Sequence, residues 1–233
     1  MTAPADRFSC VAIVPAGGSG ARFGSAIPKQ YIVIAGATVL EHTLNALRHC
    51  AAIEHIFVVV PPDEDRADVV AARVGNTTVL RCAGGQRAHT VRNALAAISR
   101  QVRRDAWVLV HDAARPCVAE EDVDKLVSTV ASHAVGGLLA SPVTDTLKRS
   151  TAAGEVAETV SREGLWRAQT PQMFRYELLG HALNASPEVT DEAQAVESLG
   201  LSPLLVRGST RNIKITLPED AEIAEIYLSG NQR

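Results

Sequence analysis

Short apolar runs alternate with amphipathic segments through the first two-thirds of the chain. Between the runs, apolar residues recur at helical spacing, as at Leu40, Leu44 and Leu47. Runs of the length of buried strands lie at 10–14, 56–60, 78–82, 107–110 and 136–140. Strands and helices that alternate in this way favour a sheet covered by helices on its faces. The pattern predicts a three-layer α/β domain of Rossmann-like character with a mixed, mainly parallel sheet.

Residues 142–167 change character and predict a protruding β-arm. Polar and apolar residues alternate over 143–148, a polar turn follows at 150–154, and the apolar pattern returns from Val156. Because a two-stranded arm is only marginally stable alone in water, it needs a surface to pack on. The same arm in a second subunit is the simplest such surface, so we expect a homodimer.

The last third of the chain contains further elements. Thr190 is expected to cap a helix whose first turn is acidic. Strands are expected at 204–206 and 213–215, and a final helix from Pro218. The residues of that helix expected to face inward are Ile223, Ile226 and Tyr227.

Composition excludes several classes of protein. The 233 residues are 46% hydrophobic and 21% charged with a net charge of −3, so no cationic excess suggests general nucleic-acid binding. The four cysteines are widely spaced and form no Cys-x-x-Cys pair, which argues against a zinc or redox site and fits the cytoplasm. We expect no signal peptide and no membrane span. Without a linker or repeat, residues 1–233 are expected to form one domain, with the arm inserted at about 142–167.

A glycine-rich loop with two following cations comes directly after the first apolar run. Glycines let backbone N–H groups turn inward and form a cradle for an anion. The cations are Arg22 and Lys29, and Pro28 precedes the lysine. Spaced cations after such a loop favour a polyphosphate ligand. The candidate loop residues are Pro15, Ala16, Gly17, Gly18 and Gly20.

Other interpretations of this loop remain open. It could be a plain structural turn, since glycine-rich turns after a first strand are common. A dinucleotide site would require an acid about 20 residues further on at the end of a second strand, but Glu41 lies at an expected helix start. A Walker loop would require Gly-Lys-Ser or Gly-Lys-Thr, whereas Lys29 follows proline.

Asp112 follows the run at 107–110, where the carboxyl end of a strand would place it at a ligand site. A carboxylate there can meet a sugar hydroxyl or a bound Mg²⁺, and Arg115 supplies a planar fork for phosphate. The plainer interpretation is an aspartate that caps the next turn beside a surface arginine. His111 can equally be a neutral structural histidine or a general base.

Five further segments accompany the glycine loop and its Pro-Lys pair. They are Gly84-Gly85-Gln86-Arg87, His111-Asp112-Ala113-Ala114-Arg115-Pro116, Asp145-Thr146-Leu147-Lys148, Thr190-Asp191-Glu192-Ala193 and Asn212-Ile213-Lys214-Ile215-Thr216. Together they resemble the family of 2-C-methyl-D-erythritol 4-phosphate cytidylyltransferases from about residue 11 to 227. The resemblance implies transfer of a cytidylyl group from CTP to that polyol phosphate, with release of pyrophosphate, in the non-mevalonate synthesis of isoprenoid precursors.

The resemblance also implies site residues, a cofactor and an assembly. Catalytic residues would be Arg22, Lys29, Arg162 and Lys214. CTP-binding residues would be Pro15, Ala16, Gly17, Gly18, Gly20, Gly85, Arg87, Thr90, Asp112 and Ala113. Residues that bind the polyol phosphate would be Asp112, Arg115, Thr146, Arg162, Thr190 and Lys214. Mg²⁺ would be bound with the CTP phosphates, and the arm would form the homodimer and help to complete the active site.

Two alternatives belong to other classes of function. One is a cytidylyltransferase for another polyol phosphate, such as ribitol 5-phosphate. The other is a non-catalytic module that binds CTP, which the retention of both Arg22 and Lys29 disfavours. An oxidoreductase is less favoured still, because the dinucleotide pattern is incomplete.

Overall fold

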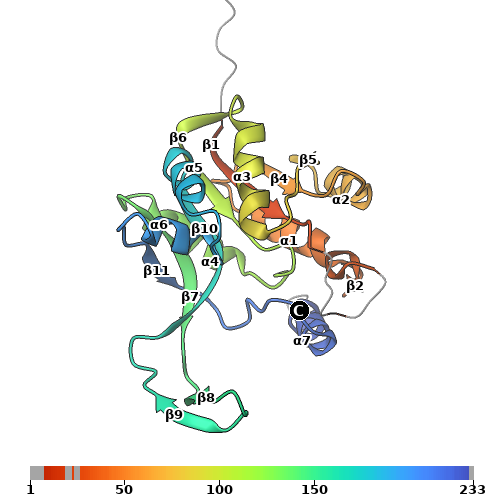
Figure 1. The fold of residues 1–233 in the computed structure, drawn as a ribbon. Helices are drawn as coiled ribbons and strands as arrows, with labels where there is room; N and C mark the ends of the chain where they lie inside the picture. Colours follow the sequence, from red (N-terminus) through yellow and green to blue (C-terminus); the bar gives the residue numbers. More distant parts are fainter. Residues whose placement is uncertain (1–7, 19–22, 24–26, 231–233) are drawn as a thin grey trace, which may run out of the picture.

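A seven-stranded sheet forms the body of the protein in the computed structural model, which describes residues 8–18, 23 and 27–230 (Figure 1). The strand order is β11-β7-β10-β6-β1-β4-β5. Only β10 pairs antiparallel to its neighbours within this described sheet. The strands are β1 (Phe8–Pro15), β4 (His55–Val59), β5 (Thr77–Leu80), β6 (Val102–Val110), β7 (Gly136–Pro142), β10 (Trp166–Arg175) and β11 (Leu204–Arg207).

Helices cover both faces of the sheet, which confirms the three-layer α/β prediction. One face packs against α1 (Val39–Arg48), α2 (Arg66–Val74) and α4 (Glu120–Val130). The other face packs against α3 (Arg87–Ile98), α5 (Tyr176–Ala185) and α6 (Glu192–Glu197). Leu40, Leu44 and Leu47 form the buried stripe of α1, and Thr38 caps this helix by accepting a hydrogen bond from the Glu41 backbone N–H.

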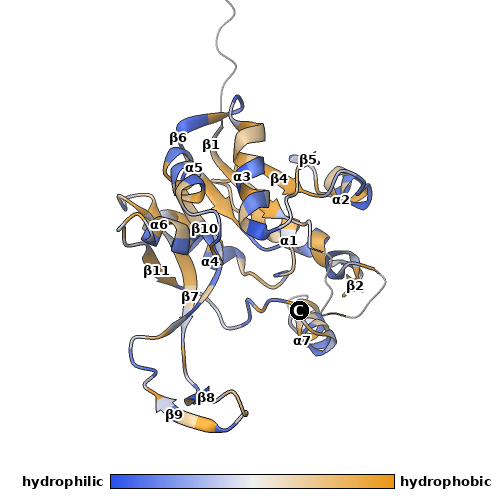
Figure 2. Ribbon diagram, in the orientation of Figure 1, coloured by the Kyte–Doolittle hydropathy of each residue, from blue (hydrophilic) through white to orange (hydrophobic). Residues whose placement is uncertain are grey.

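The central strands are apolar on both faces because both faces are covered. Residues 11–14 of β1 and 108–110 of β6 are fully buried. Figure 2 shows this as continuous orange strands between helices whose outer faces carry hydrophilic residues. The expected strands at 10–14, 56–60, 107–110 and 136–140 are confirmed, and β6 and β7 are longer than the apolar runs alone indicated.

The predicted arm leaves the body between β7 and β10 and projects away from the sheet (Figure 1). Its strands, β8 (Leu147–Ser150) and β9 (Val156–Val160), pair antiparallel with Leu147 opposite Val160. At the base of the arm, the Val143 N–H donates to the Leu165 carbonyl over 3.0 Å. The two ends of the arm are therefore neighbours.

Two local predictions are wrong. Residues 213–215 form no strand: the segment makes a backbone hydrogen bond from Ile215 N to Ala114 O over 2.8 Å and stays outside the sheet. Asp191, not Thr190, caps α6, and its carboxylate accepts from Gln194 N over 2.9 Å. Thr190 instead donates from its N–H and its hydroxyl to the Gln194 side-chain oxygen.

The expected inward face of the last helix is also wrong in part. Ile223 and Ile226 of α7 (Pro218–Gly230) are 41% and 69% exposed, whereas Ala224 is fully buried. The helix packs through Ala224 and Leu228 onto a small cluster. Short pieces precede α1: η2 (Lys29–Tyr31), β2 (Val33–Ile34) and β3 (Ala37–Thr38). Among the described helices, none is long and apolar enough to cross a membrane.

Candidate active site

A cleft of about 410 Å³ opens at the carboxyl ends of the central parallel strands. Its walls are the glycine loop after β1, the loop after β5 that leads into α3, the loop after β6, and the 214–216 segment. The lining residues are Pro15, Ala16, Gly17, Gly18, Lys29, Gln30, Gly84, Gly85, Gln86, Arg87, Thr90, Asp112, Ala113, Ala114, Lys214 and Thr216. This edge is where ligands bind in open α/β sheets.

The described part of the glycine loop is held from behind by a buried glutamine. Gln30 Nε2 donates to the carbonyl of Ala16 over 2.8 Å and to that of Gly18 over 3.3 Å. Gly17 has no room for a side chain, because a Cβ there would lie 2.7 Å from the Cβ of Ala83. The loop after β1 and the loop after β5 therefore meet at contact distance and form one wall of the cleft.

The Lys29 side chain extends to the 214–216 segment of the cleft. It follows Pro28 at the start of η2, and its Nζ donates to the Ile215 carbonyl over 2.6 Å. The N–H of Ile215 donates in turn to the carbonyl of Ala114, in the loop after β6. The ammonium group is thus held against the 214–216 segment, across the cleft from the described part of the glycine loop.

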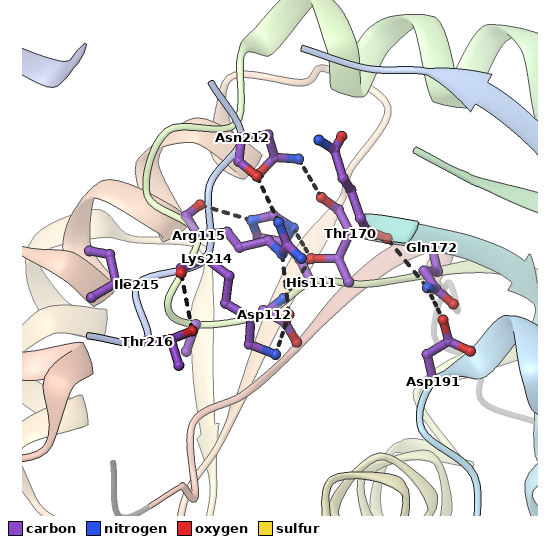
Figure 3. Close-up of polar contacts among 12 residues, drawn as sticks. His111, Asp112, Arg115, Thr170, Gln172, Asp191, Asn212, Lys214, Ile215 and Thr216 are labelled. Atoms are coloured by element: carbon purple, nitrogen blue, oxygen red, sulfur yellow. Dashed lines mark hydrogen bonds and ion pairs between the residues drawn. The ribbon is translucent and has the colours of Figure 1, made fainter. Parts of the chain in front are cut away.

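Asp112 gathers three cations around one buried carboxylate. Figure 3 shows two of them, Arg115 and Lys214. Arg87 Nε lies 2.9 Å from Oδ1, while Lys214 Nζ and Arg115 Nε lie 2.9 and 3.3 Å from Oδ2. Burial opposes ionisation of Asp112, but the cations overcome it and hold its pKa well below the usual range. Asp112 is therefore an anion that orients cations at neutral pH.

Arg87 makes a second ion pair on its other side. Its Nη1 lies 2.6 Å from Oε1 of Glu192, whose side chain is almost completely enclosed. Burial would lower the pKa of Arg87, but Glu192 and Asp112 raise it above its usual range. Burial raises the pKa of Glu192, and Arg87 opposes that rise. With Lys29 included, four cationic side chains face two carboxylates here.

His111 is a neutral structural residue. It is fully buried, and burial lowers its pKa to about 4. The Thr170 hydroxyl accepts from the Asp112 N–H over 3.0 Å, so its proton is free for His111 Nδ1 at 2.9 Å. The other nitrogen, Nε2, then donates to the Arg115 carbonyl over 3.2 Å. Of the two interpretations offered by the sequence, this geometry supports the structural one, because His111 braces the loop that carries Asp112 and Arg115.

Comparison with known proteins identifies the family. A profile described as 2-C-methyl-D-erythritol 4-phosphate cytidylyltransferase matches residues 10–230. The chain is 50% identical over 224 residues to the enzyme of that name from Dechloromonas aromatica, covering 95% of this chain and 98% of the relative. It is 47% identical over 222 residues to the one from Chromobacterium violaceum, covering 94% and 98%. The chain belongs to the 2-C-methyl-D-erythritol 4-phosphate cytidylyltransferase family.

Solved structures of this family agree with the fold. A crystal structure described as 4-diphosphocytidyl-2C-methyl-D-erythritol synthase superposes with a TM-score of 0.85 at 41% identity, covering 95% of this chain and 100% of the other. The Francisella tularensis 2-C-methyl-D-erythritol 4-phosphate cytidylyltransferase superposes with a TM-score of 0.78 at 35% identity, covering 94% and 99%. The predicted fold class is confirmed.

The cleft brings together most of the site residues expected from the family resemblance. Those that line it are Pro15, Ala16, Gly17, Gly18, Lys29, Gly85, Arg87, Thr90, Asp112, Ala113 and Lys214. Arg115 lies behind Asp112, and its Nη1 donates to the Asn212 carbonyl over 2.7 Å. Gly20 and Arg22 lie outside the described residues.

Three expected residues do not line the cleft of their own chain. Thr146 and Arg162 are on the exposed arm, where the Arg162 guanidinium donates to the Thr144 carbonyl. Thr190 is exposed beside α6 and does not line the cleft. The roles predicted for these three residues stay predictions.

Several supporting residues escaped the sequence reasoning. Gln30 carries no motif of its own, although it follows Lys29 directly. Glu192 was taken as a helix-start acid, and only the fold brings it to Arg87, 105 positions earlier. Asn212, which donates from Nδ2 to the Thr170 carbonyl over 2.8 Å, lay inside a recognised segment without an assigned role.

Proposed function

We infer that this chain transfers the cytidylyl group of CTP to 2-C-methyl-D-erythritol 4-phosphate, giving 4-diphosphocytidyl-2-C-methyl-D-erythritol and pyrophosphate for isoprenoid synthesis. Membership of the family and two relatives near 50% identity support this reaction. The observation that carries it is the cleft itself, where a glycine loop, Lys29 and the Asp112–Lys214 pair converge at one edge of the sheet. The alternative acceptor, ribitol 5-phosphate, is not favoured by these relatives.

The chemistry asks little of a protein base. The attacking oxygen belongs to a phosphate monoester whose second pKa is about 6, so it is already anionic near pH 7. The obstacle is to bring two polyanions together and to stabilise charge on the α-phosphate and the leaving pyrophosphate. Positioning and fixed positive charge supply most of this kind of catalysis.

Four cations share the work in our proposal. Arg22 and Lys29 stabilise the charge that develops on the triphosphate, and Lys214 and Arg162 position the nucleophilic phosphate. The placement of Lys29 and Lys214 in one cleft supports this division. The described backbone of the glycine loop and the start of α3 would hold the nucleotide, as helix N-termini and glycine loops do with phosphates.

The proposed reaction includes Mg²⁺, bound together with the phosphates of CTP. Among the described residues, no group of three or more His, Cys, Asp or Glu side chains could hold a metal ion, and the cleft lining contains Asp112 as its single carboxylate. Both oxygens of Asp112 are already engaged by Arg87, Arg115 and Lys214, so the triphosphate and water would hold the ion. When bound, the ion neutralises negative charge on the phosphates.

A homodimer formed through the β-arm would complete the site. Thr146 and Arg162, which are expected to hold the polyol phosphate, lie on the arm and away from the cleft of their own chain. An arm with exposed Val156 and few neighbours of its own also needs a partner surface. We propose that each arm reaches the cleft of the second subunit.

We further propose that residues 1–233 form a single domain with the arm inserted at about 142–167, and that the protein works in the cytoplasm. The continuous sheet supports the first statement. The four free cysteines fit a reducing compartment and support the second.

Pyrophosphate release tests the function. The purified protein with CTP and Mg²⁺ should release pyrophosphate when 2-C-methyl-D-erythritol 4-phosphate is added, and much less with ribitol 5-phosphate. Faster release with ribitol 5-phosphate would move the function to the alternative acceptor. Binding of CTP without release with either acceptor would indicate a non-catalytic nucleotide-binding module.

A further inference from the structure

Glu192 is a fully buried carboxylate just behind the cleft, and it does not line it. Its Oε1 pairs with Arg87 Nη1 at 2.6 Å, while its Oε2 has no hydrogen-bond partner among the residues that the structure describes. A buried carboxylate with one unsatisfied oxygen is costly to maintain. The residue that Glu192 contacts, Arg87, indicates what this carboxylate does.

The position of Glu192 is set by a rigid connection to the sheet. Gln172 of β10 is buried, and its Oε1 accepts from the Ala193 N–H over 2.8 Å. Its Nε2 donates to Asp191 Oδ2 over 3.0 Å, as Figure 3 shows. Both contacts fix the first turn of α6, where Glu192 begins the helix. The carboxylate is therefore held by the sheet and not by a mobile loop.

Arg87 connects Glu192 to Asp112 in the cleft. One guanidinium edge, Nη1, is held by Glu192 and another, Nε, by Asp112 Oδ1 at 2.9 Å. Nη2 is buried and has no hydrogen-bond partner in the described part of the chain. With Oδ1 engaged in this way, Asp112 presents Oδ2 to Lys214 at 2.9 Å. An unbroken series of contacts thus connects Gln172 to the Lys214 ammonium group.

We propose that Glu192 is a positioning residue for the transfer reaction: it fixes Arg87 so that Arg87 orients Asp112, and Asp112 places Lys214 for the phosphate of the acceptor. This inference rests on the proposed function, and in particular on Lys214 as the ligand of that phosphate. It gives Arg87 an indirect role, in place of the CTP-binding role that the family resemblance implied.

Two substitutions separate position from charge. Glu192→Gln removes the charge, and Glu192→Asp keeps the charge but withdraws it by one methylene group. We expect both to raise the KM for 2-C-methyl-D-erythritol 4-phosphate at least about tenfold and to lower kcat, because small misplacements of reacting groups are costly. The KM for CTP should change by less than about threefold, since Glu192 pairs with the side chain of Arg87, whereas the backbone of the described glycine loop and of the start of α3 would hold the nucleotide.

Glu197 provides the matched control, because it is an exposed glutamate at the other end of the same helix. Glu197→Gln and Glu197→Asp should leave both KM values and kcat at wild-type levels. Thermal unfolding of every variant shows whether it is folded at the assay temperature. If Glu192→Gln does not fold, Glu192→Asp, which keeps the buried charge balanced, carries the test.

The outcomes are distinct. Wild-type kinetics in Glu192→Asp would mean that Glu192 merely neutralises Arg87, and would overturn the inference. An equal rise in both KM values would also overturn it, because the effect would then not pass through Lys214. If wild-type protein releases no pyrophosphate with any acceptor, the proposed function fails instead, before any variant is compared.

Discussion

Charged side chains in the cleft and on the β-arm differ in what surrounds them. Asp112 in the cleft and Glu192 behind it are buried and engage cations from other parts of the chain. On the arm, Arg149 and Glu158 pair across two exposed strands, and both side chains are more than half exposed. The cleft is organised by its own chain, whereas the arm displays residues that no neighbouring element fixes. The proposed function uses both regions, and the proposed homodimer is what would bring them together.

The largest expected effect is in the cleft. Lys29→Ala should leave a folded protein whose turnover is at least about 100-fold lower, because a fixed charge that stabilises the transition state is lost. Lys125→Ala is the control, since Lys125 Nζ also donates to a backbone carbonyl, that of Arg207, but on the exposed side of α4. Pyrophosphate release measures both variants, and near-normal turnover of Lys29→Ala would refute its catalytic role.

The second prediction concerns pH and the brace behind the cleft. Burial holds the pKa of His111 at about 4, below its value of about 6.5 in an unfolded chain. Between these pH values the unfolded state binds the extra proton, so stability is present above about pH 6.5 and is lost as the pH falls towards 4. The difference corresponds to about 3 kcal/mol.

Urea unfolding at pH 7 and at pH 4.5 tests this dependence. Wild-type protein should lose most of that stability, while His111→Gln should be less stable at pH 7 but show a much shallower slope. His181→Gln, at an exposed histidine of α5, should retain the wild-type slope. An unchanged slope in His111→Gln would show that other groups cause the acid sensitivity.

The third prediction extends the comparison to the arm. Arg162→Ala should reduce kcat/KM for the polyol phosphate about tenfold or more, with a smaller change for CTP, because a phosphate ligand supplied by the partner is removed. Arg149→Ala, on the same arm, should have little effect on either substrate. A monomeric arm variant with normal affinity for the polyol phosphate would contradict the shared site.

The smallest expected effect is on the arm surface. Glu158→Gln breaks the exposed pair with Arg149 and should change the free energy of unfolding by less than about 1 kcal/mol, because water screens such pairs. Chemical denaturation measures the difference. A loss as large as that expected for a buried pair would show that this part of the arm is covered in the native assembly.

Prediction from sequence was strongest where burial imposes a pattern. Residues 11–14 are fully buried as expected, and the alternation over 143–148 correctly indicated the arm. Prediction failed where an alternating pattern is not part of a sheet. Ile213 and Ile215 alternate with Lys214 as a strand would, but the segment is held by contacts with the loop after β6 and not by a ladder.

Prediction of the site residues succeeded and failed for similar reasons. Lys29, Asp112 and Lys214 lie in motifs, so their shared location could be predicted, and the cleft brings them together. Gln30 and Glu192 act through contacts that only the fold creates, and a single glutamine or glutamate has no periodicity that could reveal it. In the proposed homodimer the target of Arg162 lies on a second chain, and the position of a second chain cannot be predicted from one sequence.

The arm joins the body at two neighbouring points, whereas the cleft is built from loops spread along the chain. Val143 and Leu165 are hydrogen-bonded neighbours, and Pro142 stands opposite Trp166 in the pairing of β7 with β10. A module rooted at adjacent points can be lengthened, trimmed or exchanged for a tight turn while the strand register beneath it is preserved. In the proposed homodimer, changes to the arm would therefore alter acceptor contacts and subunit pairing while the strands that position the cleft keep their register.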